Sequence, residues 1–397
     1  MFRTVCILLV VCIVFTFFGC QPAPKTVAEL RGVWVATTLN LDYPSKPGLS
    51  AEQLQEEAET LLDRAKDLGL NAVFLQVRPC GDALYPSEYY PWSAVLSGTQ
   101  GIPPNAEFDV LSYWINAAHQ RGMELHAWIN PFRVTQGKKD ILSQQNPAYI
   151  HPEWTVKHTD GKLYLNPGIE EVRKYIIDGV VEIVSNYDVD GIHFDDYFYP
   201  DEEFPDEETF LASGASNLLD WRRENINLLI SETHAAVQNT NPEIVFGVSP
   251  FGIWQNQRSS LLGSATNGLE SYTAHAVDSR KWVKEEWVDY IAPQIYWHIG
   301  HDAADYETLV RWWVDVVRGT SVKLYIGHAG YRALTAEEGS AWYGGEELAR
   351  QLELNREYPD VSGSIHFRLG CYLESPALAT VLKNQLIEIT EVEEEHP

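Results

Sequence analysis

Apolar and polar residues alternate along most of the chain with two periods. Short runs rich in Val, Ile, Phe and Trp predict strands, and longer stretches with apolar residues every three or four positions predict helices. The predicted strands are Gly32–Thr37, Ala72–Arg78, Glu124–Asn130, Gly191–Asp195, Ile244–Ser249, Tyr290–Tyr296, Lys323–His328 and Gly363–Arg368. The predicted helices are Ala51–Leu68, Phe108–Arg121, Ile169–Asn186, Asn217–Asn239, Asp278–Trp287, Tyr306–Val317, Glu346–Glu357 and Pro376–Leu386.

This alternation of eight strands with eight helices predicts a single α/β domain, a closed (β/α)8 TIM barrel over residues 30–387. The alternative is an open doubly wound sheet, but no Gly-x-Gly-x-x-Gly turn follows an early strand. Residues 79–106, 131–167, 197–216 and 250–276 form long loops that all follow strands. We therefore expect them to lie on one face of the barrel and to form a cleft there.

The two ends of the chain are expected to lie outside the barrel. Residues 1–20 hold one charge, Arg3, before an apolar run that ends at Gly19-Cys20, which is typical of an export signal. The ending is similar to a bacterial lipobox and predicts Cys20 as a lipidated residue after residues 1–20, with an uncleaved membrane anchor as the alternative. Residues 21–29 would be a tether, and the acidic residues 388–397 a disordered tail. Either way, the barrel would face an extracytoplasmic space, anchored to a bacterial membrane through its N-terminus only.

The composition of the chain excludes several classes of binding partner. The formal net charge of −27 argues against nucleic acid and anionic membrane surfaces. Cys80 and Cys371 both follow predicted strands near the same barrel face, so they can form a disulfide in an oxidising compartment, with two buried thiols as the alternative. No Cys/His spacing indicates a zinc site, and we expect neither a metal nor a cofactor.

The candidate chemistry lies where the strands end. The fourth predicted strand runs into Asp195 and Asp196 and then into aromatic residues, and an acid at that end of a barrel strand usually belongs to the active site. Aromatic rings beside carboxylates suit a sugar. Strand alternation directs further polar and aromatic side chains inward, where they form a predicted polyol-binding set. Its members are Arg78, His126, Trp128, Asn130, His193, Gln294, Tyr296, His366 and Arg368, joined by Trp254 and Trp297 as stacking surfaces.

Each of these residues also has a structural interpretation. Asp195 would be only an ion-pair partner if it contacts Arg78 or Arg368 inside the barrel. The histidines would be hydrogen-bonded wall residues, and Trp128 and Trp297 would be core packing as readily as sugar platforms.

Glycoside hydrolysis normally needs two carboxyl groups. The candidate partners of Asp195 are Asp196, Asp42, Asp82 and Glu270. In a second scheme a 2-acetamido group of the sugar is the nucleophile. Asp195 would then orient it, Tyr296 would hydrogen-bond its oxygen, and Asp196 would be the proton donor.

Seven stretches carry a resemblance to a known family: Arg31–Val35, Leu75–Pro79, His126–Pro131, Asp190–Tyr197, Gly247–Trp254, Ala292–Trp297 and Tyr325–Gly327. Together they resemble the bacterial glycosyl-hydrolase-like family 10 lipoproteins. The resemblance implies a (β/α)8 barrel with glycosidase activity, and some members look like envelope enzymes that cut peptidoglycan strands stripped of peptides. The fourth-strand motif is also distantly similar to that of family 18 chitinases, but His193 and Tyr197 replace two of its acids.

These observations predict a cell-envelope glycoside hydrolase that acts on a β-linked, GlcNAc-containing glycan, with peptide-free peptidoglycan as the leading substrate. One alternative is a glycosidase for a dietary or host polysaccharide. Another is a glycan-binding lipoprotein without catalytic activity. A metal-dependent deacetylase is disfavoured because no ligand set lies at a strand end.

Overall fold

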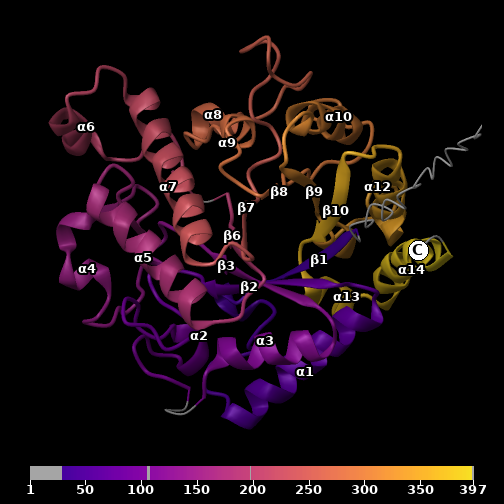
Figure 1. The fold of residues 1–397 in the computed structure, drawn as a ribbon, viewed down its shortest axis with the longest axis horizontal. Helices are drawn as coiled ribbons and strands as arrows, with labels where there is room; N and C mark the ends of the chain where they lie inside the picture. The colour runs from indigo at the N-terminus through magenta and orange to yellow at the C-terminus, as the bar shows by residue number, and fades with distance from the viewer. Residues whose placement is uncertain (1–28, 105–107, 197, 396–397) are drawn as a thin grey trace, which may run out of the picture.

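The predicted strands close into a ring of eight parallel strands inside a ring of helices (Figure 1). The computed structural model describes residues 29–104, 108–196 and 198–395. The barrel strands are β1 (Leu30–Val35), β2 (Ala72–Arg78), β3 (Glu124–Ile129), β6 (Gly191–Phe194), β7 (Val245–Val248), β8 (Tyr290–Ile291), β9 (Lys323–His328) and β10 (Val361–His366). β1 pairs with both β2 and β10, which closes the barrel and confirms the predicted fold class.

Eight main helices cover the outside of the barrel (Figure 1). They are α1 (Ala51–Asp67), α3 (Val110–Gln120), α5 (Glu170–Asn186), α7 (Leu218–Thr240), α9 (Ser279–Lys284), α10 (Tyr306–Val317), α12 (Glu346–Arg356) and α14 (Pro376–Glu395). Each both begins and ends within a few residues of its predicted bounds, except that α14 ends later than predicted. That helix continues to Glu395, so residues 388–395, which we expected in a disordered tail, are helical.

Shorter elements occupy the connections. These are the helical turns η1 (Thr38–Asn40), η2 (Pro152–Trp154) and η3 (Tyr343–Gly345), the short helices α2 (Ala94–Ser97), α4 (Pro147–Ile150), α6 (Glu207–Ser213), α8 (Ser271–Ala274), α11 (Tyr331–Leu334) and α13 (Leu369–Glu374), and the antiparallel pair β4 (Thr155–Lys157) and β5 (Leu163–Leu165). Most of them belong to the long loops that follow strands, which is where a TIM barrel builds its cleft.

Two apolar cores result from the strand alternation. The interior of the barrel packs Trp34, Phe74, Trp128, Tyr290 and Ile365 together, and a larger cluster fills the layer between strands and helices. Glycines make room for the large interior rings. A Cβ on Gly191 would lie 2.2 Å from Nδ1 of His126, and one on Gly247 would lie 2.2 Å from the Tyr290 ring.

The C-terminal end of α1 lies near α14, because β1 and β10 are neighbours (Figure 1). Lys383 of α14 forms an ion pair of 2.7 Å with Asp67 of α1. Within the described range Cys80 and Cys371 are buried, and they are free thiols rather than a disulfide. Residues 1–20, including Cys20, and residues 21–28 of the tether lie outside the described part. None of the described helices combines the length and apolar character needed to cross a membrane.

Candidate active site

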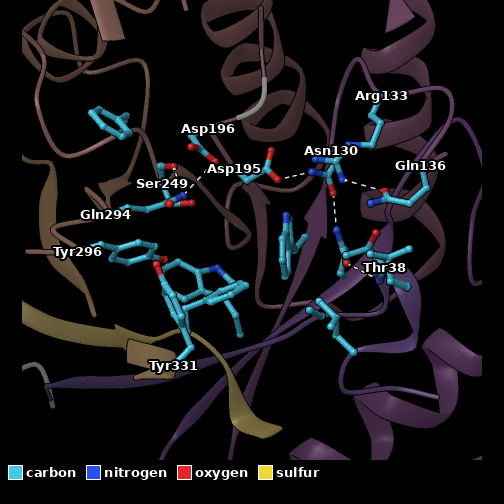
Figure 2. Close-up of a pocket in the computed structure, with 18 of the residues that line it drawn as sticks. Thr38, Asn130, Arg133, Gln136, Asp195, Asp196, Ser249, Gln294, Tyr296 and Tyr331 are labelled. Carbon is cyan, nitrogen blue, oxygen red and sulfur yellow. Dashed lines mark hydrogen bonds between the residues drawn. The ribbon is translucent and has the colours of Figure 1, made fainter. Parts of the chain in front are cut away.

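A cavity of about 520 Å³ opens where the barrel strands end (Figure 2). It brings together seven of the predicted site residues: Trp128, Asn130, Asp195, Asp196, Gln294, Tyr296 and Trp297. They come from the ends of β3, β6 and β8, which are far apart in sequence and converge because the strands are parallel. A volume of this size is typical of a small-ligand site.

Asp195 is held in place by a chain of amides that begins at the backbone. The N–H groups of Thr37 and Thr38 each donate to Oε1 of Gln76 at 2.9 Å. The Gln76 amide nitrogen must then face Asn130, and it donates to Oδ1 of Asn130 at 2.6 Å. The Asn130 Nδ2 group in turn donates to Oδ2 of Asp195 (Figure 2). Because backbone N–H groups can only donate, this chain fixes the orientation of both amides.

Asp196 has a different environment from its neighbour. It is half-buried, and Gln294 donates to its Oδ1 at 3.2 Å. The same Gln294 nitrogen also donates to the backbone oxygen of Ser249 at 3.1 Å, which positions the amide. Burial raises the pKa of Asp196 above its usual value, against the lowering effects of His275 and of the Gln294 hydrogen bond. A carboxyl group in this state suits proton donation.

Aromatic side chains form much of the cavity wall. Trp297 is half-buried and meets the Phe251 ring edge-on at 5.5 Å, and Tyr296 lies 6.0 Å from the Tyr331 ring. Trp128 is only 6% exposed and belongs to the interior core. Trp297 is therefore more available as a stacking surface than Trp128, which serves mainly as the floor.

His126 and His193 point into the barrel as predicted, but they lie below the cavity and do not line it. His193 accepts a hydrogen bond of 3.1 Å from Nε1 of Trp34 and contacts the Tyr290 hydroxyl at 2.9 Å. That hydroxyl lies 3.3 Å from Nδ1 of His126. Burial lowers the pKa of His193 well below its usual value, so it is a neutral wall residue. Alternation gives the inward direction but not the depth. Inward residues near the end of a strand line the cavity, and those earlier in the strand lie below it.

Arg78 was expected to point inward and instead faces the outer layer. The pairing of β2 with β3 shifts between Gln76 and Arg78, so Arg78 pairs with the outward residue Ile129. An extra residue at such a bulge reverses which face the next side chains occupy. Arg78 donates to the backbone oxygen of Asn130 at 2.6 Å and lies 4.4 Å from the Tyr90 ring centre. It supports the loop that carries Asn130.

His366 and Arg368 also lie away from the cavity. His366 is buried on the outer side of β10, stacked on His328 at 5.0 Å and 3.2 Å from the Tyr372 hydroxyl of α13. Tyr372 and Ser364 satisfy the two ring nitrogens of His366 within the outer layer, so its polarity did not mean that it lines the cavity. Arg368 forms an ion pair of 2.5 Å with the buried Asp42. The inward residue at this strand end is Phe367, which lines the cavity.

Trp254, expected as a stacking surface, packs elsewhere. Its indole N–H donates to Asp278 at 2.9 Å and its ring stacks on Trp312 at 5.8 Å. It lies in the loop after β7 and braces that loop against α9 and α10.

The other candidate acids do not line this cavity. Asp42 is paired with Arg368, Asp82 accepts a hydrogen bond of 3.0 Å from Gln100, and Glu270 accepts one of 2.6 Å from Ser259. Among the described residues that line the cavity, the acidic ones are Asp195 and Asp196. Arg78 binds the backbone oxygen of Asn130, and Arg368 forms its ion pair with Asp42. Tyr197 lies outside the described residues.

Several lining residues carried no signal in the sequence. They are Thr38, Leu39 and Leu41 after β1, Arg133 and Gln136 after β3, Phe251 after β7, and Tyr331, Arg332 and Phe367 near β9 and β10. Nearly all of them stand in loops or short turns, where no periodicity relates a position to a direction. Strand alternation could have predicted only Phe367 among them, because it directly follows His366 at the end of β10. In the described part of the chain no group of His, Cys, Asp and Glu is arranged to hold a metal ion.

Structural comparison supports the fold. The glycoside hydrolase domain of PgaB (BpsB) from Bordetella bronchiseptica superimposes with a TM-score of 0.59 at 17% identity, covering 90% of this chain and 99% of that one. The endo-1,4-beta-mannanase from Rhizomucor miehei gives a TM-score of 0.56 at 12% identity, covering 92% and 95% of the two chains. At these identities the likeness establishes the TIM-barrel fold alone.

Sequence comparison goes further. Glycosyl hydrolase YngK of Bacillus subtilis is 43% identical over 358 residues, covering 88% of this chain and 69% of YngK. Glycosyl hydrolase DigH of Escherichia coli K12 is 40% identical over 388 residues, covering 90% of this chain and 87% of DigH. Residues 29–343 match the family model described as glycosyl hydrolase-like 10. The chain therefore belongs to the glycosyl hydrolase-like 10 family.

Proposed function

We propose that this protein is a glycosidase of the cell envelope that hydrolyses a β-linked, GlcNAc-containing glycan, and that its substrate is peptidoglycan freed of its peptides. The observation that carries the proposal is that Asp195 and Asp196 share one cavity with Tyr296 and Trp297. Carboxyl groups supply the acid chemistry of glycosidic cleavage, and the rings offer flat apolar surfaces to a pyranose.

Asp196 is the proposed proton donor. Its raised pKa keeps a proton available in a pH range where an ordinary aspartate is ionised. In the reaction this proton passes to the glycosidic oxygen as the bond to the anomeric carbon breaks, so that the leaving sugar departs as a neutral alcohol.

Asp195 is the proposed partner of the sugar's 2-acetamido group. Figure 2 shows Asp195 and Asp196 side by side, and they are consecutive residues at the end of β6. Both therefore approach a sugar from the same wall, whereas an inverting enzyme needs its second carboxylate on the opposite face of the ring. An acetamido oxygen that attacks the anomeric carbon as the glycosidic bond breaks removes this requirement. Water then attacks that carbon, opens the ring so formed and returns a proton to Asp196, which gives net retention. Asp195 would hold the acetamido N–H, and the Tyr296 hydroxyl would donate to its oxygen.

Release of new reducing ends from purified sacculi tests the proposal. Sacculi treated with an amidase to remove the peptides, untreated sacculi and a panel of dietary and host polysaccharides would be compared. We expect cleavage of the peptide-free material with retention of the anomeric configuration. Asp195→Asn and Asp196→Asn should each abolish it, with thermal stability largely kept. Asp302→Asn, at an exposed acid, is the matched control.

The other outcomes are informative. Cleavage confined to the polysaccharide panel would show that the substrate is a dietary or host polysaccharide instead of peptidoglycan. Glycan binding without turnover on any substrate would identify a binding lipoprotein. A large loss of stability in Asp195→Asn would instead support a structural role for this carboxylate.

We also propose that the barrel is held at the outer side of a bacterial membrane through lipid on Cys20. The support is the apolar run before Cys20 in the sequence. Cys20→Ser should abolish incorporation of a labelled fatty acid and move the protein from the membrane fraction. Unchanged labelling would contradict the proposal.

A further inference from the structure

A second cavity, of about 430 Å³, lies directly beside the first. Thr38, Leu39 and Gln136 line both cavities, so the two spaces adjoin along these three residues. The second cavity is built on the connections that follow β1, β2 and β3. The combined groove therefore extends from the catalytic carboxyl groups across that side of the barrel mouth.

Leu39 lies between the two cavities in an unusual backbone conformation. Leu39 and Asn40 have φ values of 55° and 54°. These lie in the left-handed region, which residues other than glycine rarely adopt. A residue in this conformation persists only where its surroundings hold it. Here Asn40 Nδ2 donates to the backbone oxygens of Pro44 and Val95, both at 2.9 Å. The result is that Leu39, an apolar residue, is 67% exposed over the groove.

The second cavity has a rigid polar floor. Gln100 donates to Oδ2 of the buried Asp82 at 3.0 Å. The side-chain Oε1 of Gln100 accepts from the Ser143 backbone N–H at 3.0 Å and from Asn146 Nδ2 at 3.1 Å. These bonds fix the groups before any ligand arrives, which lowers the entropy cost of binding.

The rim of the second cavity is apolar and its charges are all of one sign. Ile141 lines it and is 87% exposed. Its described lining residues include Asp82 and Asp140 and no lysine or arginine. Apolar side chains above polar groups suit a pyranose, which has apolar faces and hydroxyl edges. Acidic groups without a cation disfavour a sugar that bears a carboxylate.

We propose that the second cavity is a distal sugar subsite of the same groove and that it takes an uncharged N-acetylhexosamine of the glycan whose bond is cut beside Asp195. This inference rests on the proposed function. It makes hydrolysis depend on chain length, because a glycan long enough to reach Ile141 and Thr99 gains contacts that a short one lacks.

Oligosaccharides of alternating GlcNAc and MurNAc, from the disaccharide to the octasaccharide, test the subsite. In the wild type we expect kcat/KM to rise by about tenfold between the shortest cleaved substrate and the octasaccharide, as added binding worth about 1.4 kcal/mol would give. Thr99→Trp places an indole at the exposed rim of the cavity and should abolish this gain. Ile141→Ala removes an exposed apolar side chain without a folding burden and should reduce the gain severalfold.

Thr240→Trp is the matched control, because Thr240 is exposed at the end of α7, before β7, on the opposite face of the barrel. It should keep the gain with chain length. An unchanged gain in both Thr99→Trp and Ile141→Ala would overturn the subsite while leaving the proposed function intact.

If the wild type cleaves none of these glycans, binding decides the question separately. Calorimetry with the octasaccharide should then show tighter binding than with the tetrasaccharide in the wild type, and equal binding of the two in Thr99→Trp. Equal binding of the two in the wild type would overturn the subsite.

Discussion

The amide of Asn130 donates a hydrogen bond to the carboxylate of Asp195, and the amide cannot turn round. Gln76 already donates to the Asn130 carbonyl oxygen, and the backbone N–H groups of Thr37 and Thr38 fix Gln76. The Asp195 carboxylate at the end of β6 is thus oriented by groups at the ends of three other strands, β1, β2 and β3.

Loss of this donor should impair catalysis. Asn130→Ala removes a hydrogen bond to a charged group, worth about 1.5–3 kcal/mol, so we expect kcat/KM to fall roughly tenfold to a hundredfold. Gln76→Glu should have a similar effect, because a carboxylate facing Asn130 Oδ1 favours rotation of that amide away from Asp195. Kinetics on peptide-free glycan would measure both. Wild-type rates in the two variants would contradict the orienting role.

The upper limit of the pH profile should follow Asp196. The hydrogen bond from Gln294 lowers the pKa of Asp196, so Gln294→Leu should raise that pKa further. Because the protonated form is the proton donor, activity is lost as pH rises through this pKa. The alkaline limb of kcat/KM against pH should therefore move to higher pH in Gln294→Leu, even if its maximum is lower. A limb that stays in place would assign the acid elsewhere.

Asp196 should also lower stability at high pH. Its pKa is higher in the folded than in the unfolded protein, so the folded state binds the proton more tightly and loses stability as pH rises from the unfolded-state value through the folded-state value. Asp196→Asn removes this loss. We expect its melting temperature to exceed that of the wild type at pH 8, by roughly 1–2 °C for each kcal/mol in a domain of this size. The two proteins should converge near pH 3, and a constant difference would contradict the linkage.

The buried histidines predict acid sensitivity of the opposite sign. Burial lowers the pKa of His328 to about 4, and it lowers that of His366 well below its usual value. The unfolded chain takes up protons from about pH 6.5 downward, so stability should fall as pH drops from about 6.5 to about 4. His328→Gln should flatten this fall by up to about 3 kcal/mol in chemical denaturation series. An equally steep fall would show that other groups control it.

Trp297 should contribute to substrate binding rather than to chemistry. We expect Trp297→Ala to raise KM about tenfold with a smaller change in kcat, because a stacking surface acts on substrate and transition state alike. Trp297→Phe should recover most of the affinity. Trp287→Ala, a half-buried tryptophan just before β8 at the other end of the barrel, is the control. A loss of kcat without a change in KM would exclude the platform role.

The sequence determined the barrel and the position of its chemistry. Strand and helix periods differ so clearly that all eight barrel strands match predicted segments, with shifts of only a few residues at most ends, although β8 is much shorter than its prediction. The same period directed Asn130, Asp195 and Gln294 to the interior, because alternation on a strand is a local property of the backbone. Because barrel sites lie at the carboxyl ends of the strands, the predicted strand ends were enough to locate the cavity.

Tertiary structure decided how deep each inward side chain lies, which face of its strand it occupies after a bulge, and which loop residues line the cavity. His193 and Asp195 share a face, but only the later one reaches the mouth, and the bulge after Gln76 turned Arg78 outward. Leu39 and Tyr331 line the cavity from short turns, where the sequence has no periodic pattern that predicts the direction of a side chain. Local alternation fixes which way a side chain points along one strand. What it meets there depends on neighbours that are remote in sequence, and those are set only when the ring closes.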